Sequence, residues 1–295
     1  MAITWEDKPL PEVALRRLWL ADAPRAHALS RLVGWSLTLA SWERMILWGG
    51  RGCFALYRGD ALVATAIATV YGRERAWIGG VITHPDHRRQ GLATRLMTVA
   101  LDYLQARSVP HVLLDASEQG RPLYEALGFR PIYSIEIWAG RASSYLGPRA
   151  RPLRRGDLDA VVALDAETFG VARGRILRRL VQDYPHLAWV DEEDGRIAGF
   201  LLAQDDRQDG TPAHLGPWMH RSPWGAEKLL RTALSVLIGR EVRVDIPDRN
   251  PHATALAYAH NLRHRRVCTR MHLGPGDPPP ELITQHYGVA ALATG

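Results

Sequence analysis

Apolar and polar positions in the first half of the chain follow two periods. The runs 52–57 and 61–71 are apolar, and Arg58-Gly59-Asp60 between them offers a glycine for a turn, so they predict a hairpin. Residues 76–83 form another strand-like run, which ends before Pro85. The next apolar positions repeat with helical spacing and predict an amphipathic helix over 92–104: Leu92, Leu96, Met97, Ala100, Leu101 and Leu104.

Further elements flank this pattern. Asp22 as a cap and Pro24 near a first helical position predict a helix within 15–38. Three elements follow the helix at 92–104: a short buried strand at 112–115, a helix at 121–127 that closes on Gly128-Phe129, and an alternating strand at 132–138. The first half is therefore predicted to be α/β, with a mostly antiparallel beginning.

The second half repeats this order of elements. Residues 155–164 echo the first helix, and the runs 187–190 and 197–202 around Glu193-Asp194-Gly195 echo the hairpin. A strand at 215–219, a helix at 226–237 and a strand at 241–246 then follow in matching order. The chain is therefore predicted to be a tandem duplication.

The predicted domain boundaries follow from this repeat. The linker 147–152, rich in Gly, Pro and Arg, separates a domain at 1–146 from a second at 147–274. A tail covers 275–295, in which we expect one further strand near Tyr287.

Composition limits the classes of protein. The 295 residues are 46% hydrophobic, which is enough to fill two cores. No apolar run approaches the roughly 20 residues that span a bilayer, so we expect a cytoplasmic protein without a membrane partner. The net charge of +6 comes from dispersed arginines without an aromatic-basic motif, and we therefore expect no nucleic-acid partner.

Cysteine and histidine usage adds little chemistry. Two cysteines, Cys53 and Cys268, are too few for a disulfide scaffold. His260 and His264 lie four residues apart on a predicted helix, with Cys268 beyond them. No fourth ligand can be named, so we predict no metal site.

The segment between the strand at 76–83 and the helix at 92–104 carries the most informative chemistry. It lacks the Gly-Lys-Ser/Thr of a P-loop and the G-x-G-x-x-G of a dinucleotide fold. Unpaired N–H groups and the dipole at a helix start attract anions, and a glycine allows close approach. We predict a pyrophosphate cradle, the alternative being a plain basic turn; its residues are Arg88, Arg89, Gln90, Gly91, Leu92, Ala93 and Thr94.

The pattern Arg88-x-x-Gly91-x-Ala93 resembles the acyl-CoA pyrophosphate loop of the GCN5-related N-acetyltransferases, the GNAT superfamily. Tyr124, four residues before Gly128, matches the family's tyrosine shortly before a Gly-Phe pair. The tandem arrangement resembles bacterial two-domain members. The resemblance implies an α/β (α+β) fold class, with two tandem GNAT folds, each a mixed, largely antiparallel twisted sheet flanked by helices. It also implies acetyl-CoA as cosubstrate.

The resemblance implies roles for single residues. In the family, backbone N–H groups hold the thioester carbonyl where a bulge splays the strand from its parallel neighbour, which assigns this role to Val81, Ile82 and Thr83. Gly79-Gly80 is consistent with such a bulge, and equally with close packing against a helix. Tyr124 is the candidate general acid for the departing CoA thiolate, the alternative being a packed tyrosine.

The general base is less sharply indicated. Asp115, at the end of the strand at 112–115, is the first candidate, and the alternative is that it caps the following turn. His84 and Asp86 follow as candidates. We expect the acceptor in the region 34–48, where three tryptophans either cage a cation or pack the helices: Trp35, Trp42 and Trp48.

The second copy has lost these features. Its loop, 220–225, has Pro223 and Trp224 where small residues with an N–H are needed, and 262–264 lacks the Gly-Phe pair. We therefore predict a degenerate, non-catalytic second domain. The expected activity is acetyl transfer from acetyl-CoA to a primary amine of a small-molecule acceptor, with the oligomeric state left open. The alternatives are a non-catalytic acyl-CoA-binding or regulatory module and a nucleic-acid binder.

Overall fold

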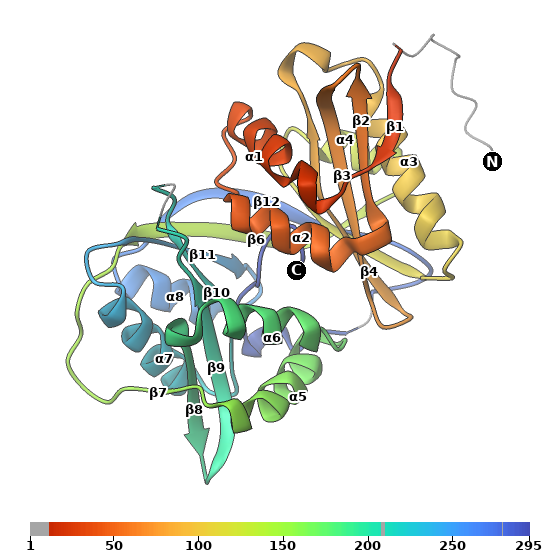
Figure 1. Cartoon of the computed structure of the whole chain (residues 1–295). Coiled ribbons are helices and arrows are strands. Elements are labelled where there is room, and N and C mark those ends of the chain that lie inside the picture. Colours follow the sequence, from red (N-terminus) through yellow and green to blue (C-terminus); the bar gives the residue numbers. More distant parts are fainter. Residues whose placement is uncertain (1–11, 208–209, 279) are drawn as a thin grey trace. The chain divides into compact units, whose positions relative to one another are not determined.

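The computed structural model describes residues 12–207, 210–278 and 280–295. Its secondary structure is mixed α/β, with a largely antiparallel twisted sheet flanked by helices (Figure 1). Of the described residues, unit 1 holds 12–70 and 78–108, and unit 2 holds 71–77 and the rest from 109 onward. No helix in these ranges is long and apolar enough to cross a bilayer.

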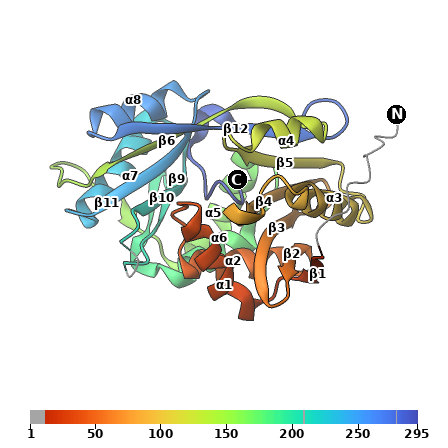
Figure 2. The same cartoon turned by 90° about the horizontal axis from the view of Figure 1, so that it is seen from above.

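Unit 1 is a sheet with helices on both sides. Strand β1 (Ala14–Arg17) pairs with β2 (Cys53–Arg58), which forms an antiparallel hairpin with β3 (Ala61–Tyr71), and β4 (Arg75–Thr83) follows β3. Helices α1 (Ala23–Leu32) and α2 (Leu39–Gly49) pack together on one side, and α3 (Leu92–Gln105) lies on the other (Figure 2). Gly59, with φ +57°, forms the hairpin turn, as predicted.

The helix predicted within 15–38 is confirmed by α1, which has Asp22 at its N-cap position and Pro24 in its first turn. Residues 14–17 form an edge strand, because their backbone pairs with β2 and their arginines cover aromatic rings. The Arg17 guanidinium lies 4.7 Å from the ring centroid of Phe54. The structure also has a second helix, α2, which begins where the Thr38 hydroxyl accepts a hydrogen bond from Ser41 N at 3.0 Å.

Unit 2 contains a longer run of strands. Their order is β4-β5-β12-β6-β11-β10-β9-β8-β7, and β13 pairs with β10. The bounds are β5 (His111–Ala116), β6 (Arg130–Arg141), β7 (Arg151–Pro152), β8 (Ala188–Glu193), β9 (Arg196–Gln204), β10 (Ala213–His220), β11 (Glu241–Pro247), β12 (Arg263–Leu273) and β13 (His286–Gly288). The strand predicted near Tyr287 is confirmed by β13.

Strands of the two sequence halves interleave in unit 2. Strand β12 lies between β5 and β6, antiparallel to both, with Cys268 opposite Ile135. Strand β6 continues the exchange, because it also pairs with β11 and places Trp138 opposite Val244. The compact units therefore do not coincide with the predicted division into 1–146 and 147–274, although the repeated order of elements is present.

The described residues of unit 2 include five α-helices. Helix α7 packs on the strands β8 to β10, and it also contacts α8 (Figure 1). Helix α8 ends at Ala259 and His264 lies in β12, so the expectation that His260 and His264 share a helix is wrong. The bounds are α4 (Arg121–Ala126), α5 (Leu158–Phe169), α6 (Gly174–Asp183), α7 (Pro223–Val236) and α8 (Pro251–Ala259).

One buried histidine, His272, makes the stability of this core depend on pH. His272 in β12 is 2% exposed, and its Nε2 lies 3.0 Å from Nδ1 of His111 in β5. Burial, followed by His111 and Arg130, lowers the pKa of His272 from 6.5 to about 4. Acid therefore protonates the unfolded chain first, and the stability present above about pH 6.5 is lost as the pH falls toward about 4.

We expect the free energy of unfolding, measured by urea titration, to fall over this range less steeply in His272→Gln than in the wild type. His252→Gln, at an exposed position of α8, serves as the control. Equal pH slopes in His272→Gln and the wild type would contradict the prediction.

Candidate active site

The predicted pyrophosphate cradle is built from the start of α3 in unit 1. Gly91 precedes the helix with φ +75°, and Arg89 also has a positive φ, +58°. The Arg95 N–H donates to Gly91 O at 3.0 Å, as the first backbone bond of the helix. The N–H groups of Leu92, Ala93 and Thr94 precede it and have no acceptor within the helix. The loop thus presents several donors beside a left-handed glycine.

The side chains of the loop add charge and polarity. Arg88 and Arg89 are exposed. The Gln90 amide donates weakly to Asp86 O at 3.5 Å, and its Oε1 is buried without a hydrogen-bond partner among the described residues. Opposite the loop, buried apolar side chains fix α3 to the sheet: Leu92, Leu96, Met97, Ala100 and Leu104.

Strand β4 carries the predicted thioester-binding backbone next to an irregularity. Gly80 has φ +61°, and its carbonyl accepts a hydrogen bond from the Thr65 hydroxyl at 2.7 Å. This left-handed residue is what a bulge requires, while Trp42 lies 3.4 Å from where a Cβ would stand, so both predicted readings of Gly79-Gly80 have support. Val81 and Thr83 are half-buried and Ile82 is buried.

The tryptophans expected to cage an acceptor are mostly core residues. Trp42 is fully buried, and its indole N–H donates to the Ser30 hydroxyl at 3.1 Å. Trp48 is 8% exposed, whereas Trp35 is 37% exposed. Packing therefore accounts for Trp42 and Trp48, and Trp35 alone among the three is open to a ligand.

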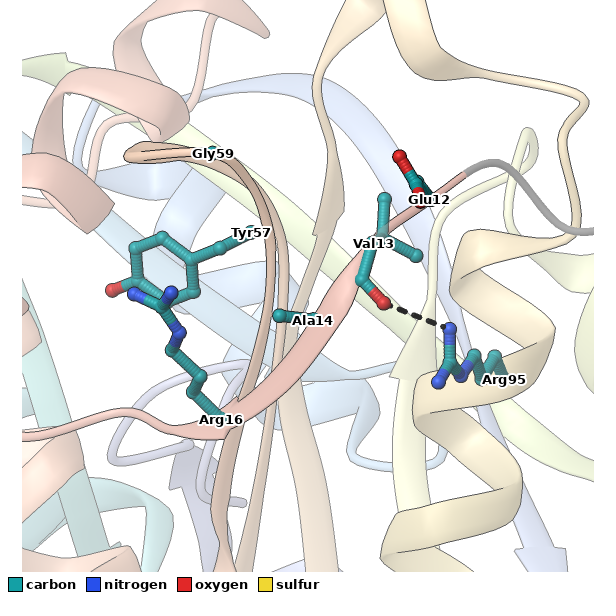
Figure 3. Close-up of a pocket in the computed structure, with 7 residues that line it drawn as sticks. All are labelled: Glu12, Val13, Ala14, Arg16, Tyr57, Gly59 and Arg95. Carbon is teal, nitrogen blue, oxygen red and sulfur yellow. Dashed lines mark hydrogen bonds between the residues drawn. The ribbon is translucent and has the colours of Figure 1, made fainter.

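A groove of about 720 Å³ lies in unit 1 beside the first turn of α3. Figure 3 shows the Arg16 guanidinium over the Tyr57 ring, 5.0 Å from its centroid. Arg95 Nη1 donates to Val13 O at 3.3 Å in the same view. The groove thus carries two guanidinium groups, those of Arg16 and Arg95, together with the carboxylate of Glu12.

Tyr124 lies in unit 2, on α4. Its ring is 8% exposed and packs edge-on against Phe129, with centroids 6.1 Å apart. Phe129 N donates to Tyr124 O at 3.0 Å, and Gly128, with φ +88°, closes the helix. Burial raises the pKa of the Tyr124 hydroxyl above its ordinary range, and Cys268 adds to the shift. The phenol is therefore protonated at neutral pH.

Asp115, on β5 in unit 2, is bound on both carboxylate oxygens. Arg270 Nε and Nη2 donate to them at 2.9 and 3.0 Å, and both side chains are 0% exposed. Each carboxylate oxygen keeps a second lone pair, but the side chain is 0% exposed and lies against the Arg270 cation, which leaves an acceptor amine no open approach. The geometry favours a structural role for Asp115, and its use as a base stays an untested prediction.

The ion pair belongs to a network that sequence reasoning missed. Arg270 Nη1 donates to the Tyr133 hydroxyl, which donates to Glu281 Oε2, both at 2.7 Å. Glu281 also accepts from Arg75 at 3.1 Å. Burial alone would lower the pKa of Arg270, but Asp115 and the other acidic neighbours outweigh it and raise the pKa. No local pattern links residues that lie more than 100 positions apart.

In the second half, the corresponding helix start is that of α7. Its polar groups already have hydrogen-bond partners within the chain. Ser222 N donates to His220 Nδ1 at 2.9 Å, so His220 carries its proton on Nε2, which lies 3.1 Å from Asp191 Oδ2. Burial lowers the pKa of His220 and keeps it neutral. Potential ligand atoms of Asp191, Glu193 and His220 lie within 4.8 Å of one another. Both ring nitrogens of His220 are nevertheless engaged and Lys228 pairs with Asp191, so the cluster is not a metal site in this form.

Sequence families match both halves of the chain. The Acetyltransferase (GNAT) family matches residues 13–129, and the Acetyltransferase (GNAT) domain matches residues 161–288. The chain is a tandem GNAT protein. The two matches reproduce the predicted duplication and support acyltransferase activity in general terms.

Curated relatives of this GNAT protein are N-acetyltransferases without an assigned substrate. It is 26% identical to the uncharacterized N-acetyltransferase YitH of Bacillus subtilis over 179 residues, which is 59% of this chain and 61% of that protein. It is 30% identical to an uncharacterized N-acetyltransferase of Streptomyces griseus over 121 residues, 40% of this chain and 28% of that protein. The chain thus spans less than two thirds of either relative.

Solved structures share the fold. A candidate acetyltransferase from Pyrococcus horikoshii superposes with a TM-score of 0.81 at 23% identity, covering 99% of each chain. A GCN5-related N-acetyltransferase from Sphaerobacter thermophilus gives 0.66 at 21% identity, covering 97% of this chain and 100% of that chain. A tandem GNAT protein of the clavulanic acid biosynthesis pathway gives 0.63 at 13% identity, covering 90% and 100%. These identities show the architecture alone.

The ion pair of Arg270 with Asp115 makes a testable contribution to stability. We expect Arg270→Met to lower the free energy of unfolding by about 3–5 kcal/mol, because it leaves the Asp115 carboxylate buried without its cation. The double variant Arg270→Met with Asp115→Leu should recover part of that loss. Arg221→Met, which breaks an exposed ion pair with Glu167, is the control and should cost at most about 1 kcal/mol. Urea titration checks this, and equal losses in the Arg270 and Arg221 variants would contradict it.

Proposed function

We propose that this protein transfers the acetyl group of acetyl-CoA to a primary amine of a small-molecule acceptor. Its first copy supplies the site. The observation that carries the proposal is the start of α3, where Gly91 at φ +75° precedes N–H groups without helical acceptors and exposed arginines flank them. This combination suits a pyrophosphate, because donors, dipole and guanidinium groups all favour negative charge.

The residues of the loop also fit the ligand in detail. Leu92, Ala93 and Thr94 offer backbone N–H groups, which have no acceptors within the helix. Arg16 and Arg95 add two guanidinium groups in the groove of about 720 Å³, of which Arg95 lies in the first turns of the same helix α3.

Acetyl-CoA supplies an acetyl thioester, whose carbonyl carbon bonds to the amine nitrogen as its carbon–sulfur bond breaks and the sulfur leaves with the electron pair. The chain must polarise the carbonyl oxygen, protonate the sulfur and remove one proton from the amine. We assign the first task to the backbone N–H groups of Val81, Ile82 and Thr83, beside the irregularity at Gly80.

Tyr124 is the proposed donor to the sulfur. Its buried hydroxyl keeps its proton at neutral pH because the pKa is raised. The CoA thiolate, whose thiol has a pKa of about 8.5, is a weaker base than the phenolate of Tyr124. In water the Tyr124 hydroxyl would therefore donate a hydrogen bond to the sulfur without losing its proton. Apolar surroundings raise the pKa of the CoA thiol as well, and this brings it closer to the pKa of the Tyr124 hydroxyl.

The proton of the amine requires another route. Asp115 is held by Arg270, so we propose that the proton leaves through water or through the loop residues His84 and Asp86. His84 Nδ1 accepts a hydrogen bond from Asp86 N at 3.3 Å, and the His84 side chain is 28% exposed. The Asp86 side chain is 83% exposed, so both side chains are open to solvent and either can take up the proton.

Tyr124→Phe tests the acid. We expect kcat to fall by about 10²-fold with KM for acetyl-CoA within about twofold, because a positioned acid acts on the leaving group and phenylalanine keeps the packing against Phe129. The assay is acetylation of an amine panel with release of CoA thiol as readout. Tyr258→Phe, at a residue 67% exposed on α8, is the control. Unchanged kcat in Tyr124→Phe would remove Tyr124 from the mechanism, and tight acetyl-CoA binding without acetylation of any amine would favour the non-catalytic binding module.

A double variant Arg88→Ala/Arg89→Ala tests the cradle. We expect the Kd for acetyl-CoA to rise about 10- to 100-fold, which corresponds to one lost charge-assisted contact of about 1.5–3 kcal/mol. Binding of acetyl-pantetheine, which has no pyrophosphate, should be unchanged. Arg107→Ala, at an exposed position two residues beyond the C-terminal end of α3, is the matched control. Equal weakening toward both ligands would show that the arginines do not contact the pyrophosphate.

A further inference from the structure

Strand β13 is inserted between two strands of the second copy. Strands β10 and β11 begin with a parallel pairing of Ala213 with Val242 and His214 with Arg243. Beyond it, β13 pairs antiparallel with β10, with Gly288 opposite Trp218 and His286 opposite Met219. On its other side Val289 N donates to Asp245 O of β11 at 2.9 Å. The segment 286–289 therefore hydrogen-bonds to both strands.

The fit of this segment is close. A Cβ on Gly288 would lie 3.0 Å from Leu215 O in β10 and 3.0 Å from Val244 Cγ2 in β11. A Cβ on Gly216 would lie 2.0 Å from Val289 O, which also lies 2.9 Å from His214 Nε2. The rings of Tyr287 and Trp218 pack with centroids 5.0 Å apart and their planes tilted by 36°, and both side chains are buried.

The same strand pair in the first copy carries the proposed thioester site. Strands β4 and β5 also begin with a parallel pairing, over Arg75–Trp77 and His111–Leu113. In the order of elements β10 corresponds to β4 and α7 to α3. Counted from the last residue of each strand, Trp218 and Met219 take the places of Val81 and Ile82. In the second copy, Trp218 and Met219 pair with β13.

The start of α7 is closed in a similar way. The Ser222 hydroxyl accepts from Gly225 N at 3.3 Å and donates to Glu193 at 2.8 Å, and Pro223 has no N–H to offer. The buried carboxylate of Asp191 lies beside this helix start through His220. Both halves of an acyl-CoA site, the strand backbone and the helix start, are thus occupied by groups of the chain.

We infer that the second copy keeps the strand cleft of a GNAT domain as a binding site for its own segment 286–289, so that each chain binds a single acyl-CoA. The inference rests on the proposed function for its statement about acyl-CoA, and on the contacts of β13 for its statement about the cleft. The second copy is then a closed structural partner whose ligand is part of the same polypeptide.

The stoichiometry of acetyl-CoA, measured by calorimetry on the full chain, tests the first statement. We expect one molecule per chain and none in Gly91→Asp, which places a carboxylate in the cradle of the first copy. Two molecules per chain, or equimolar binding that survives Gly91→Asp, would place acyl-CoA in the second copy and overturn the inference. No binding in the wild type would instead contradict the proposed function.

Hydrogen exchange at Val289 tests the second statement whatever the stoichiometry. We expect its amide to be protected in the free chain and its exchange rate to stay the same when acetyl-CoA is added. Gly216→Ala, whose new methyl group would meet Val289 O, should speed that exchange at least tenfold, and Gly156→Ala, which meets open space, should not. Fast exchange in the wild type, a change on adding acetyl-CoA, or no effect of Gly216→Ala would show that the segment does not fill the cleft.

Discussion

One buried cation, Arg270, connects the segments on which unit 2 depends. From the middle of β12 its guanidinium holds Asp115 on β5 and Tyr133 on β6, and it lies 4.5 Å from the ring centroid of Trp77 on β4. The Tyr133 hydroxyl donates a hydrogen bond to Glu281, which also accepts one from Arg75. A charge without water around it is costly unless it is paired, so the arrangement of these strands must keep Asp115 beside Arg270.

That requirement explains how two copies of one fold come to share a sheet. Strand β12, from the second half of the sequence, takes the place beside β5, and β6 from the first half takes the place beside β11. Backbone groups in a buried sheet need partners, and the exchange supplies them across the duplication. The elements of the two copies thus follow the same order, but the copies differ in whether the corresponding site is open. One copy presents an open helix start at Gly91, and the other fills its strand cleft with β13.

The elements and the cradle could be predicted from the sequence because their signals are local. Helical spacing placed α3 within one residue of its observed bounds, Gly59 marked the hairpin turn, and the expected strand near Tyr287 exists. The edge strand β1 was missed because its four exposed residues carry no alternation. The pairing of β12 with β5 and the role of Arg270 depend on residues 155 positions apart, which no local pattern can join.

The candidate site divides in the same way. Glycine and arginine types in a strand-loop-helix pattern indicated the anion cradle, and the structure gives Gly91 the positive φ that such a cradle needs. The role of Asp115 could not be read from its position at a strand end, because its partner lies in the other half of the chain. The Trp42 indole was likewise ambiguous until its hydrogen bond to Ser30 placed it in the core.

The central claim is that one acyl-CoA site exists per chain and that it lies at the start of α3. A crystal structure of the chain with acetyl-CoA tests this most directly. We expect electron density for the pyrophosphate at the N–H groups of Leu92 to Thr94. We also expect β13 to lie between β10 and β11, as it does in the free chain. Density for acyl-CoA at the start of α7, or a displaced β13, would contradict it.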